Sequence, residues 1–304
     1  MAISTNLIKS FQLSALTTAL ALAGCGGGGG NDTIQPAKPG QSNGGTTTPT
    51  TNVKDVDSMT ITKSFNTFIL KQDEKFTIIA NALKSGKPVE GVIVDAIIPD
   101  PATSGIYVIT PTPITTNANG EAAIELQIKD LAKATAYLKA NSDKLSISVK
   151  PTNTKQAITN GTINLTGAAP SISTEITNVI NDARSLTLSP YNANFKFEVG
   201  TKITVSAFVA DDKGGALKNV PVTFDLPNLP SLGIYNLSGS TVNTDDKGIA
   251  TITLQVMSLD KREDLKNGFQ VDAFIDRDID LKASNRPTFK GVDNLDTNTG
   301  SVTA

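Results

Sequence analysis

Apolar and polar residues alternate along much of the chain beyond residue 58. The runs in which every second residue is apolar are 76–80, 92–96 and 122–128 in one half and 203–209, 220–224, 250–256 and 269–273 in the other. A period of two residues is that of a half-buried strand, and segments such as 211–215 supply turn residues between the runs. Because no long segment has a 3.6-residue period, the pattern predicts an all-β fold built from β-sandwiches.

The two halves of the pattern form an internal repeat. A shift of 128 residues places Gly105-Ile106-Tyr107 on Gly233-Ile234-Tyr235, and it also places Gly120 on Gly248. A period this long indicates two duplicated domains in tandem, because the units of solenoids are much shorter.

Beyond residue 131 the register of the repeat changes. A shift of 133 aligns Ala136, Leu138 and Ala140 with the strand predicted at 269–273, so the second copy is expected to carry about five extra residues at 260–264. The resulting domain organisation has six parts. They are a signal peptide (1–24), a tether (25–57), a first domain (58–150), a linker (151–184), a second domain (185–290) and a polar tail (291–304).

The amino-terminal segment has the layout of an export signal. Lys9 precedes the mostly small and apolar stretch 11–23, which as a helix is too short to span a membrane. The stretch ends in Leu22-Ala23-Gly24-Cys25, which contains the only cysteine of the 304 residues. This tetrapeptide resembles the lipobox of bacterial lipoproteins. The alternative is an ordinary secretory signal with a chance cysteine near its end.

The lipobox resemblance implies cleavage before Cys25, with a diacylglycerol on its sulfur and a further acyl chain on its nitrogen. Two or three acyl chains hold a protein on a membrane far more firmly than one. Gly26 is not the aspartate that resembles an inner-membrane retention signal, so the outer membrane is the expected location. Residues 25–57 are rich in Gly, Thr and Pro and nearly devoid of apolar residues, which predicts a disordered tether.

Composition narrows the chemistry that is available. The chain has no histidine and no tryptophan, so Ser-His-Asp and Cys-His catalysis are excluded, as are histidine-based metal sites. The formal net charge of −2 and the lack of a dense basic run argue against nucleic acid as a partner. We expect no enzymatic activity and no cofactor beyond the covalent lipid. A hydrolase that uses paired carboxylates is the remaining catalytic alternative.

An acidic series near the carboxyl end is a candidate calcium site. Its members are Asp272, Asp276, Asp278 and Asp280, and calcium binds clustered carboxylates. The spacing does not fit an EF-hand, and the alternative is a polar turn between the last two strands. A second acidic candidate combines 211–212 with 245–246.

The proline-bounded segment 227–235 is a candidate contact loop. Its apolar members are Leu229, Leu232, Ile234 and Tyr235, and an exposed apolar patch is typical of a contact surface. The alternative is that the leucines fold back over the end of the sandwich. The twin of Gly233-Ile234-Tyr235 in the first copy favours a packing role for the tyrosine.

Two segments of the second copy, Val220-Pro221-Val222-Thr223-Phe224 and 244–254, resemble the group 1 bacterial immunoglobulin-like domain. This repeat forms the stalks of the invasin and intimin adhesins. The first copy is more divergent, with Ile93 and Ala96 in place of the Pro and Phe. The resemblance implies two tandem immunoglobulin-like β-sandwiches in a surface setting, and no shared catalytic or ligand residues.

Taken together, the sequence predicts an outer-membrane-anchored surface lipoprotein that displays immunoglobulin-like domains for adhesion or protein–protein interaction. The expected partner is a protein, such as a host receptor, a neighbouring cell or a component of the pilus or envelope. The alternative is an accessory lipoprotein of a pilus or of a conjugation or secretion apparatus, facing the periplasm.

Overall fold

The computed structural model describes residues 53–158, 160–168, 179–226, 228–277 and 280–294. The expected signal peptide, Cys25 with its lipobox, Asp278 and the end of the expected tail lie outside the described residues. Within the described part of the chain, no helix has the length and apolar character needed to cross a membrane.

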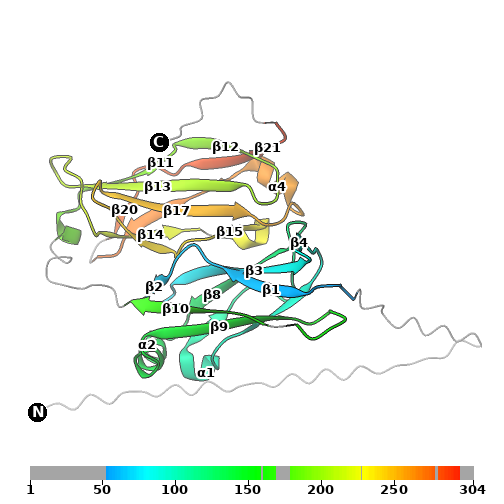
Figure 1. The fold of residues 1–304 in the computed structure, drawn as a ribbon. Coiled ribbons are helices and arrows are strands. Elements are labelled where there is room, and N and C mark those ends of the chain that lie inside the picture. Colours follow the sequence, from blue (N-terminus) through cyan, green and yellow to red (C-terminus); the bar gives the residue numbers. More distant parts are fainter. Residues whose placement is uncertain (1–52, 159, 169–178, 227, 278–279, 295–304) are drawn as a thin grey trace, which may run out of the picture. The chain divides into compact units, whose positions relative to one another are not determined.

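The first sandwich consists of two facing sheets. The strands of one sheet are β1 (Ser58–Thr62), β3 (Lys75–Lys84), β4 (Lys87–Pro88), β6 (Ile106–Val108) and β8 (Glu121–Ile128). Those of the other are β2 (Thr67–Ile69), β5 (Ile93–Ile97), β7 (Ile114–Thr115), β9 (Lys144–Pro151) and β10 (Gly161–Ala168). The strand orders are β1-β3-β8-β6, with β4 beside β3, and β2-β10-β9-β5-β7. In Figure 1, β1, β3 and β8 form one layer, and β9 and β10 belong to the other.

The alternating pattern of the sequence builds the core of this sandwich. Ile78 and Ile124 are paired neighbours on β3 and β8 and are fully buried. Leu145, Ile147 and Val149 face them from β9. Every second side chain of a strand points to the same face, so these strands line one continuous apolar layer.

The second sandwich repeats this arrangement. Its strands are β11 (Ser185–Ser189), β12 (Asn192–Lys196), β13 (Lys202–Ala210), β14 (Pro221–Asp225), β15 (Ile234–Asn236), β16 (Thr241–Asn243), β17 (Ile249–Val256), β18 (Phe269–Gln270), β19 (Asp272–Ile275), β20 (Leu281–Lys282) and β21 (Thr288–Val292). One sheet has the order β11-β13-β17-β15, which matches β1-β3-β8-β6. The other is assembled from β12-β21-β18 and β16-β14-β19-β20, since β18 and β19 follow one another directly.

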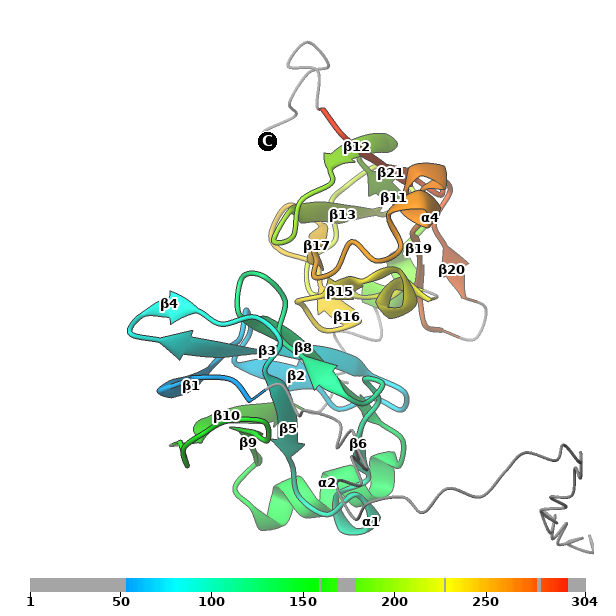
Figure 2. The same cartoon turned by 90° about the vertical axis from the view of Figure 1, so that its right-hand side faces the viewer.

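Parallel pairing occurs at the same place in both copies. β2 runs parallel to β10, and β12 runs parallel to β21, whereas the other strand pairs described are antiparallel. Figure 2 shows β12 and β21 side by side in the second copy. The shared strand order and the shared parallel pair confirm the prediction of two tandem immunoglobulin-like sandwiches.

Short helices interrupt the strands, and one of them corrects the predicted register. Those that lie wholly within the described residues are α1 (Pro101–Ser104), α2 (Leu131–Ala140), the 3-10 helix η1 (Leu229–Leu232) and α4 (Arg262–Asn267). Ala136, Leu138 and Ala140, for which the register predicts a strand, lie in α2. The buried residues of α2, Ala134 and Leu138, are four positions apart, which is a helical spacing.

The strand that corresponds to β18 and β19 is therefore β9. Val149 of β9 pairs with Ala96, and Ala273 of β19 pairs with Phe224, which lies 128 residues after Ala96. Val149 and Ala273 are only 124 residues apart. The first copy is thus the longer one in this region, and the expected insertion in the second copy at 260–264 is wrong.

The first sandwich also extends beyond its expected bounds. β10 lies in the expected linker, where it pairs with β9. Val56, expected in the tether, is 2% exposed and belongs to the first core. At the other end, β21 continues to Val292, past the expected end of the second domain at 290. The pattern does not reveal these segments because they contain few apolar residues; in β10 only Gly161, Leu165 and Gly167 are buried.

Candidate functional site

The candidate contact loop is largely internal. Leu229 and Ile234 are 1% and 0% exposed and belong to the core of the second sandwich, while Leu232 packs against that core. The prediction of a contact surface is therefore wrong for these residues, because η1 folds the leucines back onto the sandwich. Tyr235 behaves differently, since it packs against Ile79 of the first sandwich and its neighbours.

The acidic series does not converge in the described residues. The carboxylate of Asp276 lies 3.1 Å from Nζ of Lys71, and that of Asp272 lies 3.0 Å from Nε of Arg286. Asp280 is exposed. The described part of the chain holds no group of three or more His, Cys, Asp or Glu side chains placed to bind a metal ion. The candidate calcium site gains no support.

The other acidic candidates stabilise their own turns. Oδ1 of Asp245 accepts hydrogen bonds from the backbone N–H of Lys247 at 2.8 Å and of Ile249 at 2.9 Å. These bonds, with that from Ile249 the strongest, lower the pKa of Asp245. Asp211 caps its turn in the same way through Lys213 and Gly215.

The same turn chemistry appears in the first sandwich. Oδ1 of Asn117 accepts hydrogen bonds from Asn119 at 2.9 Å and Glu121 at 3.0 Å, and Gly120 has a φ of 71°. Gly248 has a φ of 72° in the equivalent turn. The shared motif in the sequence therefore encodes a capped turn with a glycine in the left-handed region.

The most elaborate polar site of the described chain lies where the two sandwiches meet, and we call it the joint. β1 ends at Thr62, opposite Ile79, which leaves the start of β3 without a strand partner on that side. The backbone N–H of Ser240 donates to the carbonyl of Lys75 at 2.9 Å, and the hydroxyl of Ser240 accepts from the N–H of Lys75 at 3.2 Å. The second sandwich thus covers an open strand edge of the first.

An apolar cluster packs beside this pairing. It consists of Ile79 and Ala123 from the outer face of the first sandwich together with Leu237, Met257 and Tyr235 from the second. Burying these side chains removes apolar surface from water on both sides of the joint, which favours docking. Burial also raises the pKa of Tyr235, and the negative charge of Glu125 acts in the same direction.

Glu74 is the most unusual residue of the joint because it is an acid that is 1% exposed. Its Oε1 accepts a hydrogen bond from the backbone N–H of Thr241 at 3.0 Å, whereas Oε2 has no hydrogen-bond partner among the residues that the structure describes. A Cβ atom at Gly239 would lie 2.8 Å from Oε1, so a side chain at this position would require the carboxylate to shift. Burial raises the pKa of Glu74, whereas the backbone N–H of Thr241, the hydroxyl groups of Thr241 and Ser240 and the charge of Lys71 oppose this shift.

Further hydrogen bonds surround the joint. Gln255 donates to the carboxylate of Glu121 at 3.0 Å, and Asn117 donates to the carbonyl of Met257 at 3.0 Å. The ammonium of Lys71 donates to Oγ1 of Thr223 at 3.0 Å. Polar contacts with fixed geometry specify one docking arrangement, whereas an apolar contact alone tolerates sliding.

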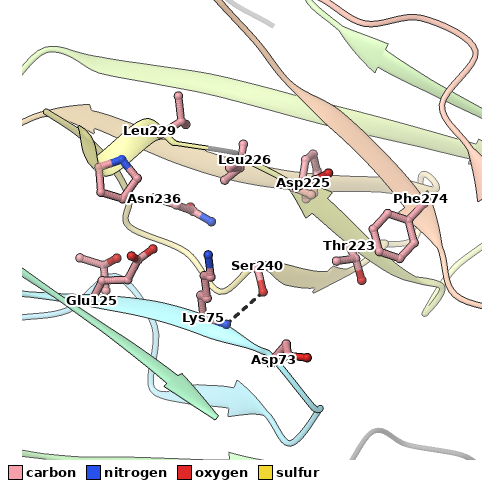
Figure 3. A pocket seen from close by; sticks show the side chains of 13 residues that line it. Asp73, Lys75, Glu125, Thr223, Asp225, Leu226, Leu229, Asn236, Ser240 and Phe274 are labelled. Carbon is pink, nitrogen blue, oxygen red and sulfur yellow. Dashed lines mark hydrogen bonds between the residues drawn. The ribbon is translucent and has the colours of Figure 1, made fainter. Parts of the chain in front are cut away.

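A cavity of about 210 Å³ lies within the joint. Figure 3 shows the ammonium of Lys75 pointing into it, with Glu125, Asn236 and Ser240 around it. Burial raises the pKa of Glu125, and Lys75 partly offsets this effect. Thr77, which also lines the cavity, is buried, and its hydroxyl has no hydrogen-bond partner in the described part of the chain.

The sequence contains a signal for the joint that the period-two pattern alone does not reveal. Ile79 follows the core residue Ile78, and Ala123 precedes the core residue Ile124, so apolar residues occupy successive positions there. A strand with apolar residues on both faces is covered on both sides. No pattern indicates Glu74 or Gly239.

No protein-family model and no curated protein matches the chain. Among solved structures, the D0-D1 domain of intimin is 19% identical, covering 77% of this chain and 98% of that chain, with a TM-score of 0.27. Invasin, described as a bacterial integrin-binding protein, is 14% identical, covering 74% of this chain and 38% of that chain, with a TM-score of 0.28. The Ig1-2 module of the Drosophila receptor protein tyrosine phosphatase DLAR is 7% identical, covering 77% of this chain and 98% of that chain, with a TM-score of 0.27. Likenesses at these TM-scores carry no conclusion about function, and the fold assignment rests on the strand order given above.

Proposed function

We propose that this chain is a lipoprotein anchored in the bacterial outer membrane that presents two immunoglobulin-like sandwiches at the cell surface for adhesion or another protein–protein contact. The observation that carries the proposal is Cys25, which is the only cysteine and completes the sequence Leu22-Ala23-Gly24-Cys25 after an apolar stretch. Diacylglycerol and an acyl chain on one residue would hold the chain on a membrane. The segment between Cys25 and the first sandwich would act as a tether and let the sandwiches reach outward.

The ionisable groups of the two sandwiches support a binding role over a catalytic one. The carboxyls with a raised pKa, Glu74 and Glu125, lie in the joint, and burial is the main cause in both cases. Neither forms part of a nucleophile–base pair among the described contacts. Asp245, whose pKa is lowered, caps a turn.

Two exposed aromatic side chains of the second sandwich are the first contact residues to test. Tyr191, in the turn between β11 and β12, is 71% exposed, and Phe208, on the outer face of β13, is 40% exposed. Aromatic residues contribute much of the binding energy of protein interfaces. Neither side chain is among the residues that form the joint.

The anchor is tested by metabolic labelling with a fatty acid in a bacterium that processes lipoproteins. We expect label on the unaltered chain and none on Cys25→Ala. The orientation is tested by adding a protease to intact cells, with a periplasmic protein as the control for leakage. Cleavage of the sandwiches in intact cells supports surface display. Protection until the outer membrane is opened would instead favour the periplasmic accessory role.

A further inference from the structure

We propose that Glu74 makes the joint a pH-sensitive switch, in which the two sandwiches dock firmly when this carboxyl is protonated and more weakly when it is ionised. The proposal concerns the sandwiches alone, so it does not depend on the lipid anchor. It rests on where the carboxyl lies, how it is held and what surrounds it.

Docking places Glu74 out of contact with water. The residue directly precedes β3, and the second sandwich covers it with Gly239 and Thr241. The close approach of Gly239 to Oε1 leaves no room for a water molecule between them. When the sandwiches separate, these two neighbours leave and the carboxyl regains water. The environment of Glu74 therefore differs between the docked and the undocked state.

In the docked state, only one of the two carboxylate oxygens of Glu74 has a hydrogen-bond donor. Oε1 has the N–H of Thr241, but Oε2 has no hydrogen-bond donor among the described residues. An ionised carboxylate accepts hydrogen bonds at both oxygens, and burying it with one oxygen unpaired is costly. Protonation removes most of this cost. The geometry thus favours the neutral acid in the docked state.

Charged groups on both sides of the joint modify this preference without reversing it. From the first sandwich these are Lys71, Asp73, Lys75 and Glu125, and from the second they are Asp225 and Asp276. Lys71 is the cation that acts on Glu74, but it already forms an ion pair with Asp276 and a hydrogen bond with Thr223. Its charge is therefore shared, and desolvation remains the larger effect on Glu74.

The sign of the pH dependence follows from this shift. Docking raises the pKa of Glu74 above its ordinary value of 4.5, so the docked state binds a proton more readily than the undocked state. The contribution of protonated Glu74 to docking is fully present below pH 4.5 and is lost as the pH rises through the raised value. Between the two pKa values the docking equilibrium constant falls by up to about tenfold per pH unit.

Hydrogen exchange in the unaltered chain measures this directly. The amide of Thr241 donates to Glu74, so its protection reports docking, while amides in β17 such as that of Ile252 report the second sandwich itself. After correction for the pH dependence of intrinsic exchange, we expect protection of residues 239–241 to fall from pH 5 to pH 8 while that of β17 stays constant. Constant protection at 239–241 over this range would overturn the proposal.

A tryptophan placed in the joint allows the responsible carboxyl to be identified. The chain has no tryptophan, so Tyr235→Trp gives a single fluorescent reporter within the apolar cluster of the joint. We expect its emission to change between pH 5 and pH 8. Added to this reporter, Glu74→Gln should abolish the change, because Gln keeps an oxygen for the Thr241 N–H and does not titrate. The exposed control Glu90→Gln should leave it intact.

Glu125 provides the decisive comparison, because burial also raises its pKa and its charge acts on Tyr235. If the pH-dependent change in tryptophan emission persists in Glu125→Gln and is lost in Glu74→Gln, the proposal is supported. If the emission change persists in Glu74→Gln, the proposal is overturned. It is also overturned if the reporter chain shows no emission change between pH 5 and pH 8.

Discussion

The two sandwiches are alike on their inner faces and different on their outer faces. The pair Ile78 and Ile124 in the first core corresponds to Val205 and Ile252 in the second, and all four side chains are fully buried. One position further along the strands, the outer face of the first sandwich carries Ile79 paired with Ala123.

The outer face of the second sandwich has a polar pair at the equivalent place. Ser206 pairs with Thr251, and their hydroxyl groups are 3.0 Å apart. Duplication preserved the residues that build each sandwich, whereas the outer face changed according to what covers it. The chemistry of the outer face therefore indicates which sheet of such a tandem is docked.

Equivalent truncations in the two cores give the largest expected effect. Ile124→Ala and Ile252→Ala each remove a fully buried side chain, so each should lower the free energy of unfolding by about 2–5 kcal/mol. Urea denaturation followed by circular dichroism measures the loss, and hydrogen exchange shows which sandwich opens. Similar losses would support equivalence of the cores. A loss below about 1 kcal/mol at either site would show that the cores are not equivalent.

Substitutions on the outer faces should change the free energy of unfolding differently in the two copies. Ile79→Ser removes an apolar side chain from the joint and should cost about 2 kcal/mol, which is the order of the transfer free energy of a buried isoleucine. The change at the equivalent position of the second sandwich, Ser206→Ala, affects a side chain outside the contacts of the joint and should stay within about 0.5 kcal/mol. Urea denaturation of both variants measures the difference. Equal effects would contradict the idea that docking distinguishes the faces.

The fold was predictable because the period-two pattern and the repeat both arise from burial on one face of each strand. The prediction failed where composition is ambiguous. α2 is rich in alanine, which fits a strand alternation and a helix equally well, and only the Asp130 cap that accepts from Lys133 marks its start. β10 escapes the pattern because polar residues dominate it.

The joint was much harder to predict than the fold. Ile79 and Ala123 leave a visible break in the alternation, but Glu74 and Gly239 have no local signature in the sequence. Their roles come from a contact between segments 165 residues apart, in which backbone and carboxylate approach closely. The candidate sites based on acidic spacing and on the leucine loop were less informative, because ion pairs, local capping or core packing account for their residues.

The smallest expected effect is a difference in acid sensitivity between the two equivalent turns, which Asn117 and Asp245 cap. Asp245 and Asn117 cap them with the same hydrogen bonds, but only Asp245 titrates. The pKa of Asp245 is lowered from its ordinary value of 3.8. The ionised carboxylate therefore stabilises the turn fully above pH 3.8, and this stabilisation is lost as the pH falls through the lowered pKa.

Asp245→Asn should therefore make the second turn behave as the first does. We expect the amide of Ile249 to lose protection below pH 4 in the unaltered chain and to keep it in Asp245→Asn, while the amide of Glu121 in the first turn is unaffected in both. Hydrogen exchange at acidic pH measures all three cases. Equal loss of protection at Glu121, in the first sandwich, would mean that acid weakens both sandwiches, and the single carboxylate would then not distinguish the turns.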